Sequence, residues 1–359
     1  ASLSFTAAGS LIAPFLGRFM DRHGAKHIMA GSLVLITVSY LLRPLMTELW
    51  HWYALSFRQY LGYAGGSILP TGRLVGIWFQ HTRGRVTGIT AMGNNFGGLV
   101  MPPLLGFILP ILMWQGAYVV LGIMSGVLVL YTLLVISENP PVQRTSRGSR
   151  SLPPRPILTG WTLREAMRNK AFYAITLAIM LGTFTYSAIL PQMITHLTDQ
   201  GVSIRVASLA LSIFAIFGMV GKLLMGFLAE RITARYALMI NLSGQAIFLV
   251  LMIWAGTPMI MWIAIPLFGY FHGAFGALFQ LVVQSTFGVR HYGSIMGTVN
   301  MTTVVSFGIG PILAGASFDL TGSYRVVFIT VAALFLVGAL ALSQAKAPER
   351  KTVLEEGLA

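Results

Sequence analysis

Residues 17–26, with the sequence Gly-Arg-Phe-Met-Asp-Arg-His-Gly-Ala-Lys, form a short basic stretch between two apolar runs. A related stretch, Gly-Phe-Leu-Ala-Glu-Arg-Ile-Thr-Ala-Arg, occupies residues 226–235 and also separates two apolar runs. The two stretches are 209 residues apart, and the same ungapped shift places Gly84 on Gly293. Gly and Pro mark close backbone approach and helix kinks, so matching them means matching helix geometry. The chain is therefore predicted to be a duplicated helical bundle.

Composition indicates a protein that crosses a membrane several times. The 359 residues are 55% hydrophobic and only 9% charged, and the mean hydropathy is +0.76. A soluble chain of this length would need far more charge to cover its surface. The net charge of +14 is spread over short loops without interleaved aromatics, so no nucleic-acid partner is expected. The chain has no Cys, and we expect neither a metal site nor a cofactor.

Apolar runs long enough for membrane helices recur along the whole chain. A membrane-spanning helix needs about 20 mostly apolar residues. Eleven runs meet this requirement: Leu3–Met20, Ile28–Met46, Tyr53–Phe79, Val86–Leu109, Ala117–Ile136, Phe172–Ile194, Val206–Leu228, Ala237–Trp254, Ile260–Phe287, Ile295–Phe318 and Val326–Leu342. The predicted fold is an all-α membrane protein.

The runs divide the chain into two bundles. A Pro- and Arg-rich stretch separates them, and Thr162 and Glu165 near its end have the spacing of a capping box that opens a short surface helix. The predicted units are an N-terminal bundle over residues 1–136, a cytoplasmic linker over 137–171, a C-terminal bundle over 172–343 and a cytoplasmic tail over 344–359.

The two halves hold five and six runs, which a duplication does not explain by itself. Under the 209-residue shift, the counterpart of the run at residues 172–194 would precede residue 1. We therefore expect one N-terminal helix to be absent from this chain, so that its helices are numbers two to twelve of twelve. The alternative is a protein with eleven spans.

The distribution of Lys and Arg predicts the orientation, because these residues accumulate in cytoplasmic loops. One set of alternate loops holds most of them, whereas the opposite set holds only Arg205 and Arg325. The two repeated stretches, the linker and the C-terminus are therefore expected on the cytoplasmic side of a cell (inner) membrane. We expect a monomer in the lipid bilayer.

The repeated stretch resembles the signature turn of the major facilitator superfamily, at Gly17, Asp21, Arg22, Gly24 and Lys26. The resemblance covers nearly the whole chain and implies two pseudo-symmetric six-helix bundles that transport a solute by alternating access.

Further motifs are similar to the monocarboxylate transporter and oxalate–formate antiporter branch. These are Trp78-Phe79 before Arg83-Gly84, Trp161-Thr-Leu-Arg-Glu-Ala and Gly221-Lys222-Leu-Leu-Met-Gly226. The chain departs from the branch at Lys222, where an Arg is usual. The run at 295–318 also lacks the Lys that oxalate transporters carry, which weakens oxalate as the substrate.

The spans contain cations but no carboxylates. All ten acidic residues lie in loops, tails or at helix ends, whereas Arg43, Arg58, Arg73, Lys222 and His272 lie within spans. A charged residue at the centre of a span costs at least about 2.5 kcal/mol, so it usually faces a cavity or a partner. These spans suit an anionic substrate.

Lys222 is the first choice for the substrate carboxylate, because the family position matches, and Arg58 is the second. The alternative for both is a long side chain that reaches the membrane surface. Arg43 and Arg73 are interpreted as anchors at the outer and inner surfaces. His272 is a candidate to carry a coupled proton, although a lone buried histidine is more often a hydrogen-bonding residue.

Other polar groups within spans are weaker candidates for substrate contact, because polar side chains commonly tie membrane helices together. Tyr63 and Gln192 are included among the predicted substrate-binding residues. The remaining groups are Asn94, Asn95, Tyr186, Gln280 and Asn300.

The family resemblance implies a conformational latch at the signature turn. Asp21 would meet the N-terminal end of helix eleven near Gly293 and Ser294 in the outward-facing state, and Glu230 with Arg231 would form a less complete equivalent. The latch set is Gly17, Asp21, Arg22, Gly24, Lys26, Glu230 and Arg231. The alternative is a solvated turn that only orients the protein by its charge.

Paired Pro and Gly residues predict bending points at equivalent places in helices five and eleven. The pairs are Pro102 with Gly106 and Pro311 with Gly315. Such breaks free backbone groups in a span, and static packing is the alternative role.

The sequence thus predicts a secondary transporter of a small organic anion, a monocarboxylate in first place, with proton symport or anion exchange as the coupling. The rivals are a transporter-like sensor or scaffold that binds its ligand without moving it, and a facilitator for a non-carboxylate solute. A membrane-embedded enzyme is disfavoured, since the spans contain no acid–base pair and no HExxH motif.

Overall fold

The computed structural model describes residues 5–66, 68–79, 81–138 and 158–345. Within these ranges the regular structure is helical. The helices are α1 (Phe5–His23), α2 (Ala25–Leu42), η2 (Arg43–Leu45), α3 (Leu49–Gly66), α4 (Ile68–Trp78), α5 (Arg83–Val135), α6 (Leu163–Met167), α7 (Lys170–Gly182), η3 (Thr185–Ile189), η4 (Leu190–Gln192), α8 (Met193–Asp199), α9 (Ile204–Ile232), α10 (Ala234–Leu251), η5 (Met252–Trp254), α11 (Pro258–Phe287), α12 (Tyr292–Thr321) and α13 (Arg325–Ser343).

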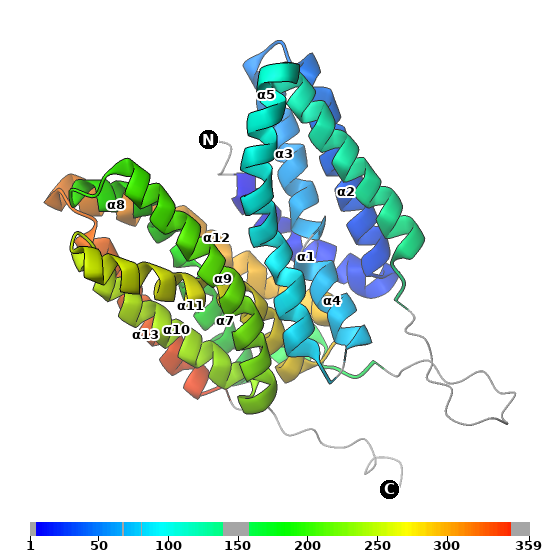
Figure 1. The fold of residues 1–359 in the computed structure, drawn as a ribbon. Helices are drawn as coiled ribbons and strands as arrows, with labels where there is room; N and C mark the ends of the chain where they lie inside the picture. Colours follow the sequence, from blue (N-terminus) through cyan, green and yellow to red (C-terminus); the bar gives the residue numbers. More distant parts are fainter. Residues whose placement is uncertain (1–4, 67, 80, 139–157, 346–359) are drawn as a thin grey trace, which may run out of the picture.

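The helices form two bundles, as the duplication predicts. Figure 1 shows α1–α5 in one bundle and α7–α13 in the other; the bundles approach each other at one end and diverge at the opposite end. The all-α prediction is confirmed. By length and composition, eight helical segments of the described residues can cross a membrane: Ala25–Leu45, Leu104–Val135, Lys170–Asp199, Ile204–Ile232, Ala234–Trp254, Pro258–Phe287, Tyr292–Thr321 and Arg325–Ser343. The other predicted spans correspond to α1, to α3 with α4, and to the first part of α5.

Four predicted spans differ in detail from the helices observed. The turn expected between residues 109 and 117 is reduced to a single non-helical residue in α5, Met113, whose φ is 54°. The run at 53–79 comprises α3 and α4. The run at 172–194 contains a π-helical turn, η3, between α7 and η4. Hydropathy indicates that a span is present, but it does not predict these local changes in helix type.

Glycines set the two helix crossings at the end where the bundles meet, called the closed end below. A Cβ added to Gly17 of α1 would lie 1.9 Å from the carbonyl oxygen of Gly293 on α12. A Cβ on Gly84 of α5 would lie 2.1 Å from the carbonyl oxygen of Gly226 on α9. The 209-residue shift relates Gly17 to Gly226 and Gly84 to Gly293, so the duplication maps one crossing onto the other. Both depend on backbone contact that only glycine permits.

Arg43 and Arg73 are not surface anchors, which corrects the sequence interpretation. Arg43 is buried inside the N-terminal bundle, where its guanidinium donates to the Tyr118 hydroxyl at 2.9 Å and to Gln59 Oε1 at 2.7 Å. Arg73 is also buried and donates to Asp21 Oδ1 at 3.0 Å. Buried guanidinium groups need such partners, and a sequence window does not show them.

The short helix α6 begins as predicted. The Thr162 side chain accepts from the Glu165 amide, and the Thr162 amide donates to Glu165 Oε2 at 2.7 Å, which completes the capping box. These hydrogen bonds from Thr162 hold the pKa of Glu165 below its usual range.

Candidate functional site

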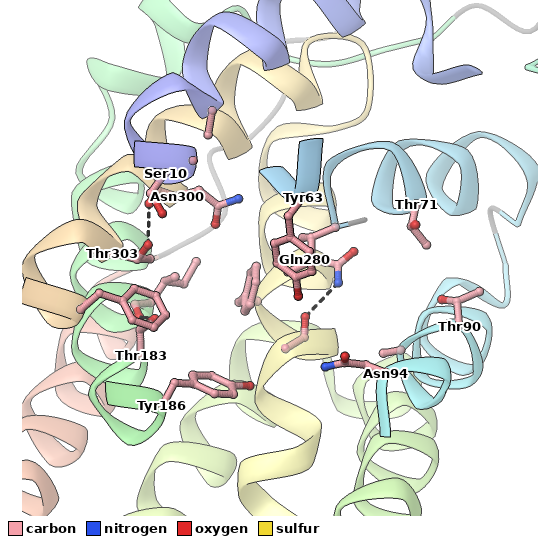
Figure 2. Close-up of a pocket in the computed structure, with 18 of the residues that line it drawn as sticks. Ser10, Tyr63, Thr71, Thr90, Asn94, Thr183, Tyr186, Gln280, Asn300 and Thr303 are labelled. Atoms are coloured by element: carbon pink, nitrogen blue, oxygen red, sulfur yellow. Dashed lines mark hydrogen bonds between the residues drawn. The ribbon is translucent and has the colours of Figure 1, made fainter. Parts of the chain in front are cut away.

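A cavity of about 460 Å³ lies between the two bundles. Figure 2 shows its walls, with labelled side chains from both halves of the chain pointing toward one another. Among the described residues the lining comprises Gly9, Ser10, Ala13, Tyr60, Tyr63, Ile68, Thr71, Thr90, Ala91, Gly93, Asn94, Ile179, Thr183, Tyr186, Lys222, Gly276, Phe279, Gln280, Asn300, Thr303 and Phe307. The volume falls in the range of small-molecule sites.

Lys222 is the one Lys, Arg, Asp or Glu in this lining set. Its side chain is buried, and Nζ donates to the Ala91 carbonyl at 2.8 Å and to Asn95 Oδ1 at 2.5 Å. Both partners lie on α5, in the opposite bundle. Neither is an anion, so the positive charge of the ammonium is not cancelled by them. The cavity therefore presents a net cation to whatever enters it.

Neutral hydrogen-bonding groups surround the rest of the cavity. The Gln280 amide donates to the Gly276 carbonyl at 2.9 Å, and the Thr303 hydroxyl donates to the Asn300 carbonyl at 2.7 Å (Figure 2). The amide oxygen of Gln280 is buried and has no hydrogen-bond partner among the described residues. The wall thus offers both donors and acceptors to a polar solute.

Of the other predicted substrate-binding residues, Tyr63 lines the cavity and His272 lies behind its wall. The His272 ring packs on Tyr186, with centroids 4.6 Å apart, and on Phe214, at 5.2 Å. Tyr186 lines the cavity, so it separates the histidine from the space. His272 Nδ1 is buried and has no partner among the described residues.

Arg58 and Gln192 do not belong to the cavity lining. Arg58 is half-buried in α3, and Gln192 is half-buried at the end of η4. The structure therefore does not bring them together with Lys222, and their roles in binding stay predictions. Hydropathy places a residue within a span but does not fix the rotation of the helix around its axis.

The contact expected for Asp21 is present at the closed end. Its carboxylate accepts from the Gly293 amide at 3.0 Å, from the Ser294 amide at 2.8 Å and from the Ser294 hydroxyl at 2.6 Å. Arg73 completes the group with an ion pair at 3.0 Å. These residues, Asp21, Arg73, Gly293 and Ser294, are called the Asp21 latch below. A carboxylate is stabilised at a helix N-terminus by the helix dipole, here that of α12.

Glu230 makes the equivalent contact in the second half. Its carboxylate accepts from the Arg85 amide at 2.9 Å and from Arg85 Nε at 2.7 Å, at the N-terminus of α5. The 209-residue shift places Asp21 on Glu230 and Arg85 on Ser294. Glu230 and Arg85 are called the Glu230 latch. Arg231 does not join it, because its guanidinium lies over the Phe227 ring at 4.6 Å.

The remaining signature residues surround the turn between α1 and α2. Gly24 has φ 92° and precedes the first residue of α2, a conformation that favours glycine. Arg22 is exposed and Lys26 is half-buried. The Ala25 amide donates to the Glu138 carboxylate, so an acidic group from the end of the N-terminal bundle covers this helix start.

The predicted bending points lie inside continuous helices. Pro102 and Gly106 are within α5, and Pro311 and Gly315 are within α12. A Cβ added to Gly106 or Gly315 would meet nothing within 4 Å, so neither glycine is required by a close neighbour. Bending during transport stays a prediction.

Asn95 and Gln280 have a larger place in the site than the sequence reading gave them. The sequence indicates only that their amides can tie membrane helices together. Adjacent amides at Asn94 and Asn95 in a glycine-rich span are the signal that could have directed attention there.

A family model described as Major Facilitator Superfamily matches residues 1–198 and 173–358. The chain belongs to this superfamily, and the protein is a multi-pass membrane transporter. The family resemblance predicted from the sequence is confirmed.

Individual relatives are similar at low identity. Monocarboxylate transporter 12 of Rattus norvegicus is 24% identical over 352 residues, which cover 90% of this chain and 72% of the relative. An uncharacterized MFS-type transporter, YcxA of Bacillus subtilis, is 22% identical over 341 residues, with 90% and 79% covered.

Solved transporter structures share the fold. The Escherichia coli fucose:proton symporter FucP superimposes with a TM-score of 0.76 at 15% identity, covering 96% of this chain and 90% of that one. The human organic anion transporter MFSD10 gives a TM-score of 0.73 at 18% identity, covering 95% and 82%.

Proposed function

We propose that this protein is a secondary transporter of a small organic anion, a monocarboxylate in first place. The observation that carries the proposal is the charge of the cavity: Lys222 faces it, and no carboxylate is among its described lining residues. Similarity to proteins named monocarboxylate transporter supports the same class of substrate.

The closed end is proposed to be cytoplasmic. Arg18, Arg22 and Lys26 lie there, with further cations in the linker, as expected for cytoplasmic loops. The structure then represents the outward-facing state, with the cavity open to the side opposite the latches. The membrane is proposed to be a cell (inner) membrane.

Substrate capture follows from the hydrogen-bond capacity of Lys222. An ammonium has three N–H donors, and the two bonds to α5 leave one of them for a carboxylate oxygen. A hydrogen bond between two charged groups is about twice as strong as a neutral one. The neutral donors of the wall would orient the rest of the molecule.

Translocation requires the closed end to open. The two bundles rock about the bound substrate, so that the cavity closes on one side and opens on the other. The Asp21 and Glu230 latches and the two glycine crossings must separate in this step, because all of them join one bundle to the other. His272 is proposed as a coupled proton carrier if the mechanism is symport; anion exchange is the alternative.

Uptake into proteoliposomes tests the proposal. Labelled formate, lactate, pyruvate and oxalate are offered with and without a proton gradient to the wild type, to Lys222→Met and to Lys222→Arg. We expect saturable uptake of at least one acid, a loss of about tenfold or more in Lys222→Met, and retention of uptake in Lys222→Arg, because arginine keeps the charge. Lys170→Met is the matched control, since Lys170 is exposed at the start of α7.

The outcomes separate the rival functions. Full uptake in Lys222→Met would contradict the anion site, and a gradient-independent rate would exclude proton symport. Binding of an acid to the detergent-solubilised wild type without any flux would favour a sensor or scaffold over a transporter.

A further inference from the structure

Lys222 is positioned by the bundle to which it does not belong. It lies on α9, yet both hydrogen bonds of its ammonium go to α5, to the Ala91 carbonyl and to Asn95 Oδ1. Ala91 and Asn95 are one helical turn apart, so they hold the ammonium between them. The counter-charge proposed for the substrate is therefore part of the contact between the bundles.

The orientation of the Asn95 amide follows from a third hydrogen bond. Asn95 Nδ2 donates to the Ala215 carbonyl of α9 at 3.0 Å. Since an amide nitrogen donates and an amide oxygen accepts, Oδ1 must be the atom that faces the ammonium. Asn95 thus contacts α9 twice, at Ala215 and at Lys222. Both its amide nitrogen and its amide oxygen form hydrogen bonds across the bundle interface.

This contact lies on the seam that closes the cytoplasmic side. A Cβ on Gly88 of α5 would lie 2.5 Å from the carbonyl oxygen of Lys222, and Gly84 and Gly226 are in backbone contact one turn further toward the closed end. When the bundles rock, α5 and α9 must separate along this seam. The bonds from Lys222 to Ala91 and Asn95 cannot survive that separation.

We propose that Asn95 is a positioning residue for Lys222, which fixes the ammonium for the substrate anion only while the cytoplasmic side is closed. This inference rests on the proposed function. In the outward-facing state two N–H groups are held by neutral acceptors and the third is available to the cavity. After the seam opens, the ammonium loses this fixed geometry and becomes hydrated from the cytoplasm, so the anion binds more weakly and is released there.

The test compares affinity at the two faces. Uptake of whichever of formate, lactate, pyruvate and oxalate the wild type transports is measured in right-side-out and inside-out membrane vesicles. We expect KM at the outer face to be lower than at the cytoplasmic face by about tenfold, the effect of one well-placed charge-assisted hydrogen bond. Asn95→Leu, which keeps the approximate size and removes both polar groups, should raise the outer KM about tenfold and leave the cytoplasmic KM within twofold.

The chain supplies a matched control in the neighbouring residue. Phe96 follows Asn95 on α5, is 58% exposed and is not among the cavity-lining residues, so Phe96→Leu should preserve the difference between the faces. An Asn95→Leu variant that shifts both KM values equally, or neither, would overturn the proposal. So would equal KM values in the wild type.

A second variant covers the case in which Asn95→Leu fails to fold. Asn95→Asp keeps the size of the side chain and loses the donor to the Ala215 carbonyl, but it gains an ion pair with Lys222 that offsets this loss. It should therefore fold and lose outer-face uptake, because the new carboxylate competes with the substrate. Uptake by Asn95→Asp with an unchanged outer KM would overturn the positioning role. Failure of the wild type to take up any of the four acids would instead contradict the proposed function.

Discussion

At the scale of single residues, the two latch carboxylates have the same topological place and different surroundings. Asp21 accepts from two backbone amides and a hydroxyl, and its ion pair with Arg73 is buried, with side-chain exposures of 7% and 6%. Glu230 pairs with Arg85, whose side chain is 51% exposed. Breaking a buried ion pair costs several times more than breaking an exposed one. The Asp21 latch should therefore contribute most to holding the two bundles together at the closed end.

The substitution Asp21→Asn is expected to weaken the closed state by about 3 kcal/mol, and Glu230→Gln by less than about 1 kcal/mol. Because the chain has no Cys, the thiol introduced by Val289→Cys is the only one, and its accessibility measures how often the closed end opens. Val289 is 5% exposed at the closed end, where it faces Gly76. Its labelling by an impermeant maleimide in inside-out vesicles should rise strongly with Asp21→Asn and only slightly with Glu230→Gln. Equal labelling in the two variants would contradict the difference in burial.

Single residues also show how far the sequence could predict the site. The sequence favours Lys222 because its position matches the family motif and because a cation in an apolar span is costly. The side chain lines the cavity, and its role in substrate binding stays a proposal. Arg58 satisfied the same criterion and yet does not line the cavity, since the rotation of α3 depends on its packing against neighbouring helices. Asn95 was missed as a functional residue because its role depends on an inter-bundle contact between residues 127 positions apart.

At the scale of helices, the crossing of α1 and α12 depends on Gly17. Replacing it with Ala would bring a Cβ to 1.9 Å from the Gly293 carbonyl oxygen, so the helices must move apart. Since this contact requires the two bundles to touch at the closed end, we expect Gly17→Ala to favour separation of the bundles there and to increase maleimide labelling at Val289→Cys several-fold.

A glycine without a neighbour provides the control for that prediction. A Cβ on Gly31 of α2 would meet nothing within 4 Å, so Gly31→Ala should leave labelling unchanged. It should also raise thermal stability slightly, because Ala is favoured over Gly by about 0.5–1 kcal/mol inside a helix. A similar rise in labelling in both variants would mean that helix propensity, and not the crossing, controls the closed end.

The helices themselves were largely predictable, because apolar length and glycine spacing are local properties of the sequence. The 209-residue shift identifies the four glycines of the two crossings as equivalent positions, although it does not indicate which of them meet. What it could not supply was backbone detail: the single-residue break at Met113, the π-helical turn at Thr185–Ile189 and the burial of Arg43 among aromatic rings. Each of these depends on tertiary neighbours.

At the scale of the whole molecule, the duplication gives two latches across the bundle interface, and each bundle contributes the carboxylate of one of them. The Asp21 latch joins α1 to α12, and the Glu230 latch joins α9 to α5. The two share no residues, so they should contribute independently to the free energy of the closed state. If the bundles move as rigid bodies, both latches must break in the same transition. Each latch therefore stabilises the same closed state relative to the open one.

A double-mutant cycle tests this rigid-body motion. In the Val289→Cys background, the free-energy changes of Asp21→Asn and Glu230→Gln, obtained from the labelled fraction, should add in the double variant to within about 0.5 kcal/mol. If the seam between α5 and α9 could open without the seam between α1 and α12, the reporter at Val289 would not respond to Glu230→Gln, alone or in the double variant. A Thr87→Cys reporter labelled from the same side would then respond to Glu230→Gln alone, because Thr87 is 1% exposed and lies between Gly84 and Gly88, the α5 glycines in contact with α9. That result would show that the two seams open separately and that the halves do not rock as units.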